Sequence, residues 1–439
     1  MTTNESKKFS NLVLKVWGHI INEGNLKKKE SKIMGLGRRQ FTESLGASLM
    51  LSLLPGIIYS SCGTKSLQSV DSVSLFLINV TKARNFSHSV WYNRQHVFLK
   101  IQSGNHIGWA EALVNKNDLD FDIAAWGAFL KELQGLKLEE AIGYVRNKFL
   151  RGTWNAKQSE PALIALYDLV GKVANKPTIQ LWGLEERNPV PGLFCILEKE
   201  VEQALRQAEI AKEQKLASHV KVKMFGITEV DLALTKALRS SFGKETFLMA
   251  DANRGYKAWT SIDELATTLK GLQSEGLDAM EDPAELTSEQ WIALQSKVGD
   301  FSLIPDRPMR PAYKALDLFN PQMGDYFNIH PDTMGTFEEA IELGKRILAS
   351  DRGLMIGDSS LIGPACTFWQ QLAIGLGASW VEAIEKPQES QVFANCVKQM
   401  STRINNKGMS EITKLHPGFG IEMDETKLGK MADNFVILY

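Results

Sequence analysis

Cysteine is scarce in this chain, which has only 4 in 439 residues. Three of them, Cys195, Cys366 and Cys396, are far apart in the sequence. Their spacing fits neither a disulfide framework nor a zinc site. We therefore expect these three to be buried thiols.

A strong net charge and long apolar runs are also absent. Lys and Arg together number 50 against 51 for Asp and Glu, which gives a formal net charge of −1. No basic stripe interleaved with aromatic residues appears, so nucleic acid is not an expected partner. No apolar run reaches the roughly 20 residues of a membrane span. The length suits one large barrel and a second domain.

The N-terminal segment 1–65 is predicted to be an export signal with a disordered extension. The pair Arg38-Arg39 precedes a moderately apolar stretch that ends at Ser60-Ser61-Cys62. Paired arginines, a weakly hydrophobic segment and small residues before a cysteine resemble a twin-arginine signal with a loose lipobox. The alternative is a buried helix with an incidental Arg pair. Met34 is an alternative start, and Cys62 is the candidate for a lipid anchor.

In the rest of the chain, the pattern of apolar residues changes near residue 190. Residues 70 to 115 read as a three-stranded meander, and helical patterns follow at about 121–135, 138–149 and 159–174. From residue 190, eight short apolar runs alternate with amphipathic helices, which predicts a (β/α) barrel. The predicted runs are Val190–Ile196, His219–Met224, Phe247–Ala250, Leu277–Met280, Phe301–Pro305, Tyr326–Ile329, Leu354–Gly357 and Trp380–Ile384.

Two lysines lie on the second predicted barrel strand. Lys221 and Lys223 are two residues apart, so their side chains point to the same side of the strand. Two ammonium groups at the barrel mouth repel each other, and we expect this to lower the pKa of one of them. A lysine tuned in this way can act as a general base. A solvated Lys-x-Lys on an edge strand is the alternative.

Three carboxylates end the next three predicted strands. Asp251, Glu281 and Asp306 would meet at the carboxyl ends of a parallel barrel, where oxygen ligands suit a hard Mg²⁺ ion. Asn253 follows Asp251 by two residues and is expected beside this site. A single Asp in such a place is more often a helix cap or turn residue. The ordered triple favours a metal site.

Several motifs, taken together and in order, resemble the enolase superfamily and its mandelate racemase/muconate lactonizing enzyme group. The resemblance covers nearly all of the chain after residue 70. It rests on the strand-end signatures above and on Gly108-Trp109-Ala110-Glu111-Ala112, Ala165-Leu166-Tyr167-Asp168-Leu169, Gln180-Leu181-Trp182-Gly183 and Pro417-Gly418-Phe419-Gly420-Ile421-Glu422.

The resemblance implies an α/β fold: a modified (β/α)7β-type TIM barrel with an N-terminal α+β capping domain completed by the C-terminal tail. The implied boundaries are 66–187 for the capping domain, 188–405 for the barrel and 406–439 for the segment that packs back on the capping domain. The loop from Lys82 to Gln95 would cap the barrel mouth. The implied cofactor is one Mg²⁺ ion, with Mn²⁺ as an alternative. The implied roles are base for Lys223 and support for Lys221.

The sequence departs from the family pattern at the sixth strand. His330 stands where muconate lactonizing relatives have a second-face lysine, and an imidazole can serve as acid or base there. A packed, satisfied histidine is the alternative. Asp358 is expected to hydrogen-bond His330 or the substrate. Arg307 stands where relatives have an acid, and it would bind substrate charge or signal lost activity. Glu385 matches the position at which dipeptide epimerases bind a substrate ammonium, and a surface role is equally open.

The implied reaction is removal of the proton α to a substrate carboxylate, with an enediolate intermediate. Racemisation, epimerisation or cycloisomerisation is the first expectation, and acid-sugar dehydration is the close alternative. An inactive, ligand-binding lipoprotein on the same fold stays open. Expected substrates are a sugar acid, an amino-acid derivative or a dipeptide. The chain is expected to be a homo-oligomer, exported in a bacterium to the periplasm or anchored to a membrane.

Overall fold

The computed structural model describes residues 68–439. The predicted export signal, Met34 and Cys62 lie outside the described residues, so export and lipid attachment stay predictions. Among the residues described, no helix is long and apolar enough to cross a bilayer.

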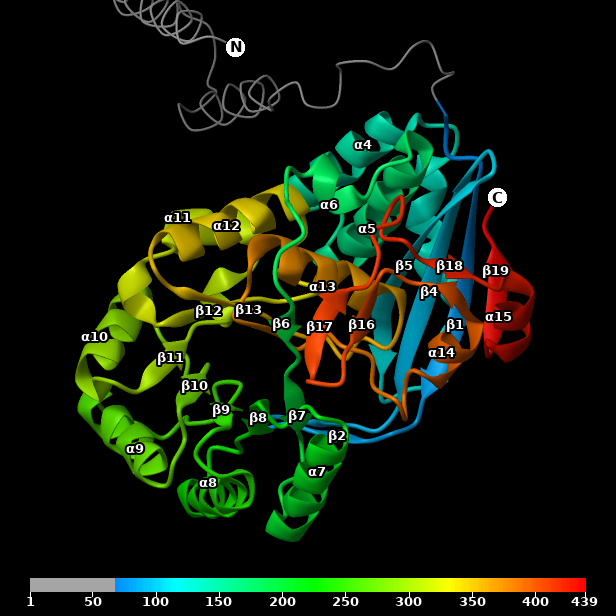
Figure 1. The fold of residues 1–439 in the computed structure, drawn as a ribbon. Helices are drawn as coiled ribbons and strands as arrows, with labels where there is room; N and C mark the ends of the chain where they lie inside the picture. The colour runs from blue at the N-terminus through cyan, green and yellow to red at the C-terminus, as the bar shows by residue number, and fades with distance from the viewer. Residues whose placement is uncertain (1–67) are drawn as a thin grey trace, which may run out of the picture. The chain divides into compact units, whose positions relative to one another are not determined.

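An antiparallel sheet with helices on one side forms the first part of the fold (Figure 1). Its strands are β1 (Ser72–Val80), β4 (Arg94–Ser103) and β5 (His106–Lys116), joined in the order β19-β1-β4-β5. The edge strand β19 (Asn434–Ile437) comes from the C-terminus and pairs antiparallel with β1. The helices are α3 (Ile123–Gly127), η1 (Ala128–Leu133), α4 (Leu138–Leu150), α5 (Ala156–Ala174) and α6 (Thr178–Leu181).

Helix α5 is the main support of this sheet. It begins at a capping box in which Asn155 accepts from the Gln158 amide, and it ends at Asn175 in the left-handed conformation. A side chain at Gly108 of β5 would put its Cβ 1.9 Å from the carbonyl oxygen of Ala165. Glycine at this position therefore lets the helix backbone lie directly against the strand.

Eight parallel strands and seven connecting helices follow, which confirms the predicted barrel. Strands β7 to β11 form one sheet and β12 to β14 another, and the amide of Asn328 donates to the carbonyl of Pro305 between them. A parallel bridge between Gly192 and Val381 closes the ring. The strands are β7 (Phe194–Ile196), β8 (His219–Lys223), β9 (Phe247–Asp251), β10 (Ala279–Glu281), β11 (Ser302–Ile304), β12 (Tyr326–Ile329), β13 (Gly353–Ile356) and β14 (Trp380–Val381). The helices are α7 (Val201–Glu213), α8 (Thr228–Phe242), α9 (Ile262–Ser274), α10 (Ser288–Val298), α11 (Ala312–Leu318), α12 (Phe337–Ala349) and α13 (Pro364–Leu376).

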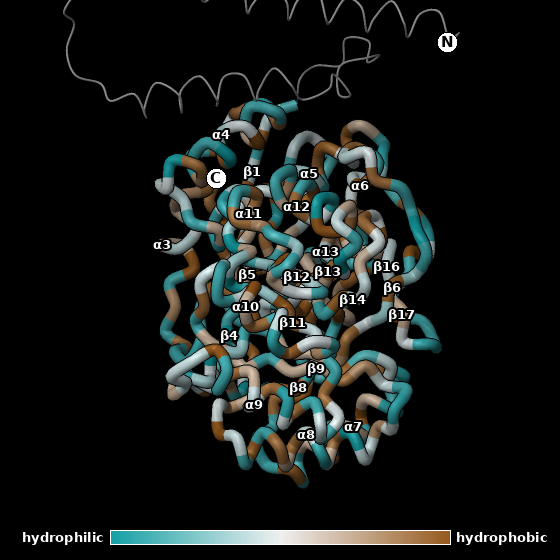
Figure 2. Tube along the Cα trace, turned by 90° about the vertical axis from the view of Figure 1, so that its left-hand side faces the viewer, coloured by the Kyte–Doolittle hydropathy of each residue, from teal (hydrophilic) through white to brown (hydrophobic). Residues whose placement is uncertain are grey.

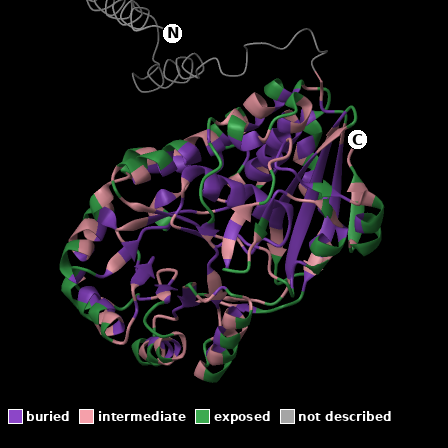
Figure 3. Cartoon of the chain, viewed as in Figure 1, coloured by how far each residue is buried: buried purple, intermediate pink, exposed green. Residues whose placement is uncertain are grey.

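The helices around the barrel are amphipathic, except for one. Figure 2 shows hydrophilic and hydrophobic residues alternating along α7, α8 and α9, as expected for helices with one face on the barrel. Every residue of α13 is buried, because α13 packs between the barrel, α5 and the C-terminal strands. Figure 3 shows that the strands of the capping sheet are mostly buried, whereas the outer helices of the barrel are partly exposed.

The C-terminal segment crosses from the barrel back to the capping sheet. Strands β16 (Thr402–Ile404) and β17 (Met409–Ile412) form a hairpin that extends to β6 (Val190–Pro191). The predicted boundary between 405 and 406 falls inside this hairpin. The remaining elements are α14 (Gln391–Cys396), β15 (Val397–Gln399), β18 (Glu422–Met423) and α15 (Glu425–Met431), followed by β19. The tail therefore completes the capping sheet, as predicted.

The cysteines of residues 68–439 are free thiols. Cys366 and Cys396 are buried, as expected. Cys195 is only half-buried, so the expectation of a buried thiol is wrong there. It lies on β7 beside a cavity described below.

Candidate active site

The inner layer of the barrel positions the candidate site. A compact apolar cluster, which includes Met249, Ala279, Ile304 and Trp380, fills the barrel interior. Side chains two residues further along a strand point to the same side, one layer nearer the carboxyl ends. The residues two positions after these four are Asp251, Glu281, Asp306 and Glu382, and all four are buried.

Lys221 lies in the middle of the acidic residues. Its ammonium nitrogen is 2.8 Å from Glu281 Oε2, 2.8 Å from Glu382 Oε2 and 3.4 Å from Asp251 Oδ2. Burial alone lowers the pKa of Lys221, but the three carboxylates outweigh it and raise the pKa well above its ordinary value. Lys221 is therefore not the lysine whose pKa is lowered, because the surrounding carboxylates outweigh its burial.

Lys223 is paired with the end of β9. Its ammonium contacts Asp251 Oδ2 and donates to Asn253 Oδ1 at 3.1 Å. Asn253 also donates its backbone amide to Asp251 Oδ1 at 2.8 Å, from a backbone with φ of 45°. Burial raises the pKa of Asp251, but Lys223 and Lys221 outweigh it and hold the pKa below its ordinary value. The structure thus brings these four predicted residues together.

The third carboxylate is held by an arginine that the sequence reasoning missed. Asp306 Oδ1 accepts from Arg310 Nε at 2.7 Å, and a terminal guanidinium nitrogen of Arg310 contacts Asp306 Oδ2. The amides of Asp306 and Arg307 both donate to Asp282. The side chain of the predicted Arg307 points to solvent instead, since the residue is exposed. The signal for Arg310 was its position four residues after an acid at a strand end.

Glu281 is the most deeply buried acid of the group. Its Oε1 accepts from Asn328 Nδ2 at 2.8 Å, while Oε2 is buried and accepts no hydrogen bond, with only the Lys221 ion pair beside it. Burial and the charge of Asp251 raise the pKa of Glu281 to about 7. Lys221 is thus the neighbour that balances the charge of Glu281 Oε2.

His330 lies just past β12, on the side of the barrel opposite Lys223. In an eight-stranded barrel the second and sixth strands face each other across the mouth, and these are β8 and β12. His330 Nδ1 is 2.7 Å from the Pro331 carbonyl oxygen, and an oxygen can only accept there, so this nitrogen carries the proton. Burial, followed by the charge of Arg310, lowers the pKa of His330 well below its ordinary value. The imidazole is therefore neutral, with Nε2 unprotonated.

Of the contacts predicted at the seventh and eighth strands, the structure tests only the one between Asp358 and His330. Asp358 forms an ion pair with Lys386 at 3.0 Å and accepts from the Leu361 amide, and the observed hydrogen bond of His330 goes to Pro331, so the predicted Asp358–His330 bond is wrong. Glu385 accepts from Gln370 Nε2 of α13 at 3.0 Å. Glu382, two residues after Trp380, lies 2.8 Å from the Lys221 ammonium.

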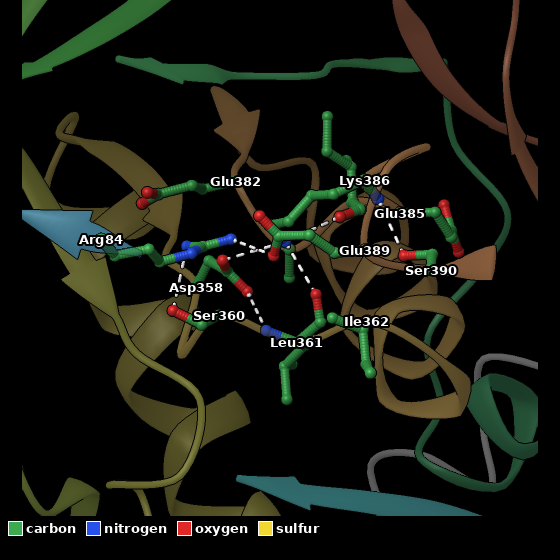
Figure 4. Close-up of polar contacts among 12 residues, drawn as sticks. Arg84, Asp358, Ser360, Leu361, Ile362, Glu382, Glu385, Lys386, Glu389 and Ser390 are labelled. Atoms are coloured by element: carbon green, nitrogen blue, oxygen red, sulfur yellow. Dashed lines mark hydrogen bonds and ion pairs between the residues drawn. The ribbon is translucent and has the colours of Figure 1, made fainter. Parts of the chain in front are cut away.

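A cavity of about 100 Å³ lies beside this site. The predicted capping loop borders it with a short hairpin, β2 (Arg84–Asn85) and β3 (Val90–Trp91), and the loop after β14 borders it from the other side. Arg84 donates to Ser360 Oγ at 2.9 Å and to Glu389 Oε2 at 2.8 Å, as Figure 4 shows. The buried Arg94 of β4 binds the same oxygen of Glu389 at 2.7 Å. Glu389 therefore ties the capping sheet to the rim of the barrel.

The hairpin also lies over Lys223, one of the two candidates for proton transfer. The ring of Phe86, at the tip of the hairpin, lies 5.3 Å from the Lys223 ammonium and 4.4 Å from the ring of Trp91. Close aromatic faces attract a cation and exclude water from it. The capping loop thus covers Lys223, and it supplies aromatic rather than acidic contacts there.

The carboxylates suit a divalent cation in chemistry, although protein cations now neutralise them. Asp251, Glu281 and Asp306 are hard oxygen donors at the ends of neighbouring strands, and Glu281 Oε2 lacks a hydrogen bond. Among residues 68–439, no three acidic, histidine or cysteine side chains are already grouped to share an ion. Lys221, Lys223 and Arg310 form ion pairs with the three carboxylates. The metal assignment stays a prediction.

Comparison with known proteins identifies relatives of two related kinds. The chain is 24% identical over 194 residues to a hydrophobic dipeptide epimerase of Enterococcus faecalis, which is 44% of this chain and 53% of that protein. It is 24% identical over 182 residues to an N-succinyl-L-Arg/Lys racemase of Bacillus cereus, or 41% and 48% of the two proteins. The match spans about half the length of these curated relatives.

Solved structures share the fold over most of the chain. A dipeptide epimerase from Cytophaga hutchinsonii, complexed with Mg and the dipeptide D-Ala-L-Val, superposes with a TM-score of 0.72 at 19% identity, covering 84% of this chain and all of that one. A muconate lactonizing enzyme from Pseudomonas fluorescens gives a TM-score of 0.70 at 16% identity over 83% of this chain. The model of the family described as enolase C-terminal domain-like matches residues 203–427, more than half of the chain. The chain therefore belongs to this family of the enolase superfamily, in the mandelate racemase/muconate lactonizing enzyme group.

Proposed function

We propose that this protein is a racemase or epimerase that exchanges the proton on the carbon α to a substrate carboxylate. The observation that carries the proposal is the placement of Lys223 and His330 after the second and sixth strands of the barrel. A substrate bound at the centre of the mouth would have one proton-transfer group on each face. Two-faced sites of this kind suit removal of a proton from one side and its return from the other.

The protonation states support one direction of this reaction. His330 Nε2 is unprotonated and can accept the α-proton, while the Lys223 ammonium can donate one. Transfer of the α-proton to Nε2 leaves the electron pair in an enediolate, and a proton from Lys223 then forms the C–H bond on the other face. The enzyme ends with a histidinium and a neutral Lys223, which is the state required for the reverse direction.

Magnesium is part of the proposal. Asp251, Glu281 and Asp306 would hold the ion, with Mn²⁺ as an alternative, and two solved relatives carry Mg beside a dipeptide. A bound divalent cation supplies Lewis-acid stabilisation of the charge that develops on the substrate carboxylate. The buried Lys221 ammonium adds a fixed positive charge next to the same acids.

The substrate class follows from the relatives and is proposed on that basis. Two relatives act on dipeptides or N-succinyl amino acids according to their names. Glu382 directly follows the eighth strand, and its carboxylate lies 2.8 Å from the Lys221 ammonium. We therefore propose dipeptides and N-acyl amino acids as first candidates, with sugar acids as the next class.

The test is solvent deuterium incorporation in ²H₂O with Mg²⁺. Pooled dipeptides, N-acyl amino acids and sugar acids are incubated with the protein, with Lys223→Ala as control, and products are followed by mass spectrometry and chiral chromatography. A gain of one mass unit with inversion supports the proposal. Loss of water with a new keto acid would instead make the protein a dehydratase. If no compound of the library incorporates deuterium or forms a product although metal is bound, enzymatic function would be contradicted and a ligand-binding protein favoured.

We also propose that the chain is exported and anchored through Cys62, and that it forms a homo-oligomer. The support for export is the Arg38-Arg39 pair followed by an apolar stretch and a cysteine. Replacing both arginines by lysine should keep the protein in the cytoplasm on cell fractionation. Replacing Cys62 by Ala should release an exported protein from the membrane fraction, and sedimentation would give the oligomeric state.

A further inference from the structure

Arg310 occupies an unexpected position beside the candidate metal ligands. It follows Asp306 by four residues, and the turn η2 (Arg307–Met309) folds its side chain back onto that carboxylate. Its guanidinium fork meets both oxygens of Asp306, since Nε donates to Oδ1 and a terminal nitrogen contacts Oδ2. The side chains are only 17% and 3% exposed. This bidentate geometry is the strongest that an arginine forms with a carboxylate.

The guanidinium of Arg310 is also surrounded by the other acids of the site. Burial lowers its pKa, and the charges of Asp282, Glu281 and Asp251 act in the opposite direction. Asp306 is nevertheless its only ion-pair partner within residues 68–439. The turn that carries Arg310 is itself fixed, because Asp282 accepts from the amides of Asp306 and Arg307. The backbone thus holds Arg310 at the acidic cluster, where its guanidinium forms an ion pair with Asp306.

The charge balance shows what this does to a metal ion. Asp251, Glu281 and Asp306 form ion pairs with Lys223, Lys221 and Arg310, and Lys221 also lies 2.8 Å from Glu382. The guanidinium contacts each oxygen of Asp306 once, so an ion that uses Asp306 as a ligand would bind on a remaining lone pair, directly beside the guanidinium. Two positive charges at the same carboxylate also repel each other strongly at low dielectric. The guanidinium therefore weakens the attraction of Asp306 for a metal ion.

We propose that Arg310 is an internal competitor for the metal ion, because its guanidinium neutralises Asp306 and weakens the binding of an ion at that carboxylate. The inference rests on the metal site of the proposed function and adds a regulatory consequence to it. Metal affinity is weakened by the free energy of the Arg310–Asp306 pair, and the metal-free form is stabilised by the same pair.

The experiment measures Mn²⁺ binding rather than turnover. Free Mn²⁺ is followed by electron paramagnetic resonance during titration of the full chain, in the wild type, Arg310→Met and Arg307→Met. Methionine keeps the apolar stem of the side chain and removes its charge. Arg307→Met is the matched control, because it removes the same charge from the same turn while its exposed side chain has no place at Asp306. Arg310→Lys keeps the positive charge but cannot contact both oxygens of Asp306 through two planar nitrogens.

The expected result is a dissociation constant for Mn²⁺ roughly tenfold or more lower in Arg310→Met, with little change in Arg307→Met and an intermediate value in Arg310→Lys. The double variant Arg310→Met/Asp306→Asn should lose the gain, because the released ligand is then absent. A thermal scan supplies a second readout: Arg310→Met should be less stable than the wild type without metal and should gain more stability from Mg²⁺.

Each other outcome overturns the inference in a recognisable way. Equal Mn²⁺ affinity in the wild type and Arg310→Met would show that Arg310 does not compete, while the proposed metal site would stand. Weaker binding in Arg310→Met would show that Arg310 supports the site instead. No Mn²⁺ binding in any of the proteins would contradict both the inference and the metal part of the proposed function.

Discussion

At the scale of single residues, the site depends on buried charges whose partners are also buried. Lys221 is the clearest case, since its ammonium lies 2.8 Å from both Glu281 and Glu382 and its side chain is 3% exposed. A buried ion of this kind depends on a nearby opposite charge, because water cannot solvate it. The arrangement is therefore sensitive to the loss of a single partner.

Replacing Lys221 by Met is expected to lower the free energy of unfolding by about 3–5 kcal/mol, because two buried carboxylates lose their cation. The measurement is urea denaturation in EDTA. Lys236→Met is the matched control, since that side chain is 72% exposed and its pair with Glu275 should contribute less than about 1 kcal/mol. Equal stability of the two variants would mean that the ion pairs around Lys221 contribute little.

Gly357 is a second sensitive position, at the end of β13. A Cβ there would lie 2.7 Å from Asn328 Oδ1 and 3.1 Å from His330 Cδ2. Gly357→Ala is therefore expected to displace both side chains and to lower kcat for the proposed reaction by roughly tenfold or more. Gly143→Ala is the control, because its Cβ would meet no atom within 4 Å. Unchanged kcat in this variant would contradict the expected displacement of His330 from a reacting position.

The sequence predicts the acids and lysines of the site better than their partners. Asp251, Glu281, Lys221 and Lys223 are found because strand alternation and position at a strand end are local properties. Arg310 was missed because two arginines follow Asp306 closely, and only the fold of the turn decides which one returns to it. These choices depend on tertiary packing, which no local pattern contains.

At the scale of elements, Glu389 joins the capping sheet to the barrel. Its carboxylate binds Arg84 of the hairpin and Arg94 of β4 with distances of 2.8 and 2.7 Å. Burial raises the pKa of Glu389, but the two arginines outweigh it and lower the pKa to about 2. The hairpin that carries Phe86 over Lys223 is thus held by one acid.

The pH dependence of stability should reveal this contact. The folded pKa of Glu389 lies below its ordinary value of 4.5, so the pairs stabilise the protein above pH 4.5 and this contribution is lost as the pH falls towards about 2. The shift corresponds to about 3 kcal/mol. In Glu389→Gln this part of the pH dependence should disappear. The measurement is urea denaturation at several pH values between about 2.5 and 7, which cover the range in which carboxyl groups ordinarily titrate.

The matched control for this experiment is Glu411→Gln. Glu411 also binds an arginine, at 2.8 Å from Arg403, but that pair lies at the surface. Its replacement should leave the curve nearly unchanged. Identical curves for the wild type and Glu389→Gln would contradict the role given to Glu389.

Elements with strong periodicity were predicted, and short ones that depend on distant partners were not. The eight barrel strands and helices α4 and α5 lie close to the predicted ranges, because repeated βα units carry a regular alternation of apolar residues. The hairpin of β2 and β3 has two residues in each strand, and β17 pairs with β6 more than 200 residues away. Pairing of this kind leaves no period in the local sequence.

At the scale of the whole molecule, the two ends of the described chain meet in one sheet. Strand β19 pairs with β1, and the rings of Phe435 and Phe76 lie 4.6 Å apart. Deleting residues 434–439 should therefore expose the edge of β1, lower the melting temperature and promote aggregation. Thermal scans with light scattering measure this. An unchanged melting temperature would show that the capping sheet does not need its last strand.

The central claim is that Lys223 and His330 act on opposite faces of the substrate, and stereospecific exchange tests it most directly. Each pure stereoisomer of the best substrate is incubated in ²H₂O with Lys223→Ala or with His330→Ala, and α-deuterium is followed by NMR. Neither variant should racemise, and each should exchange a different stereoisomer, because the remaining group reaches only one face. Loss of exchange from the same stereoisomer in both variants, or racemisation by His330→Ala at the wild-type rate, would contradict the account.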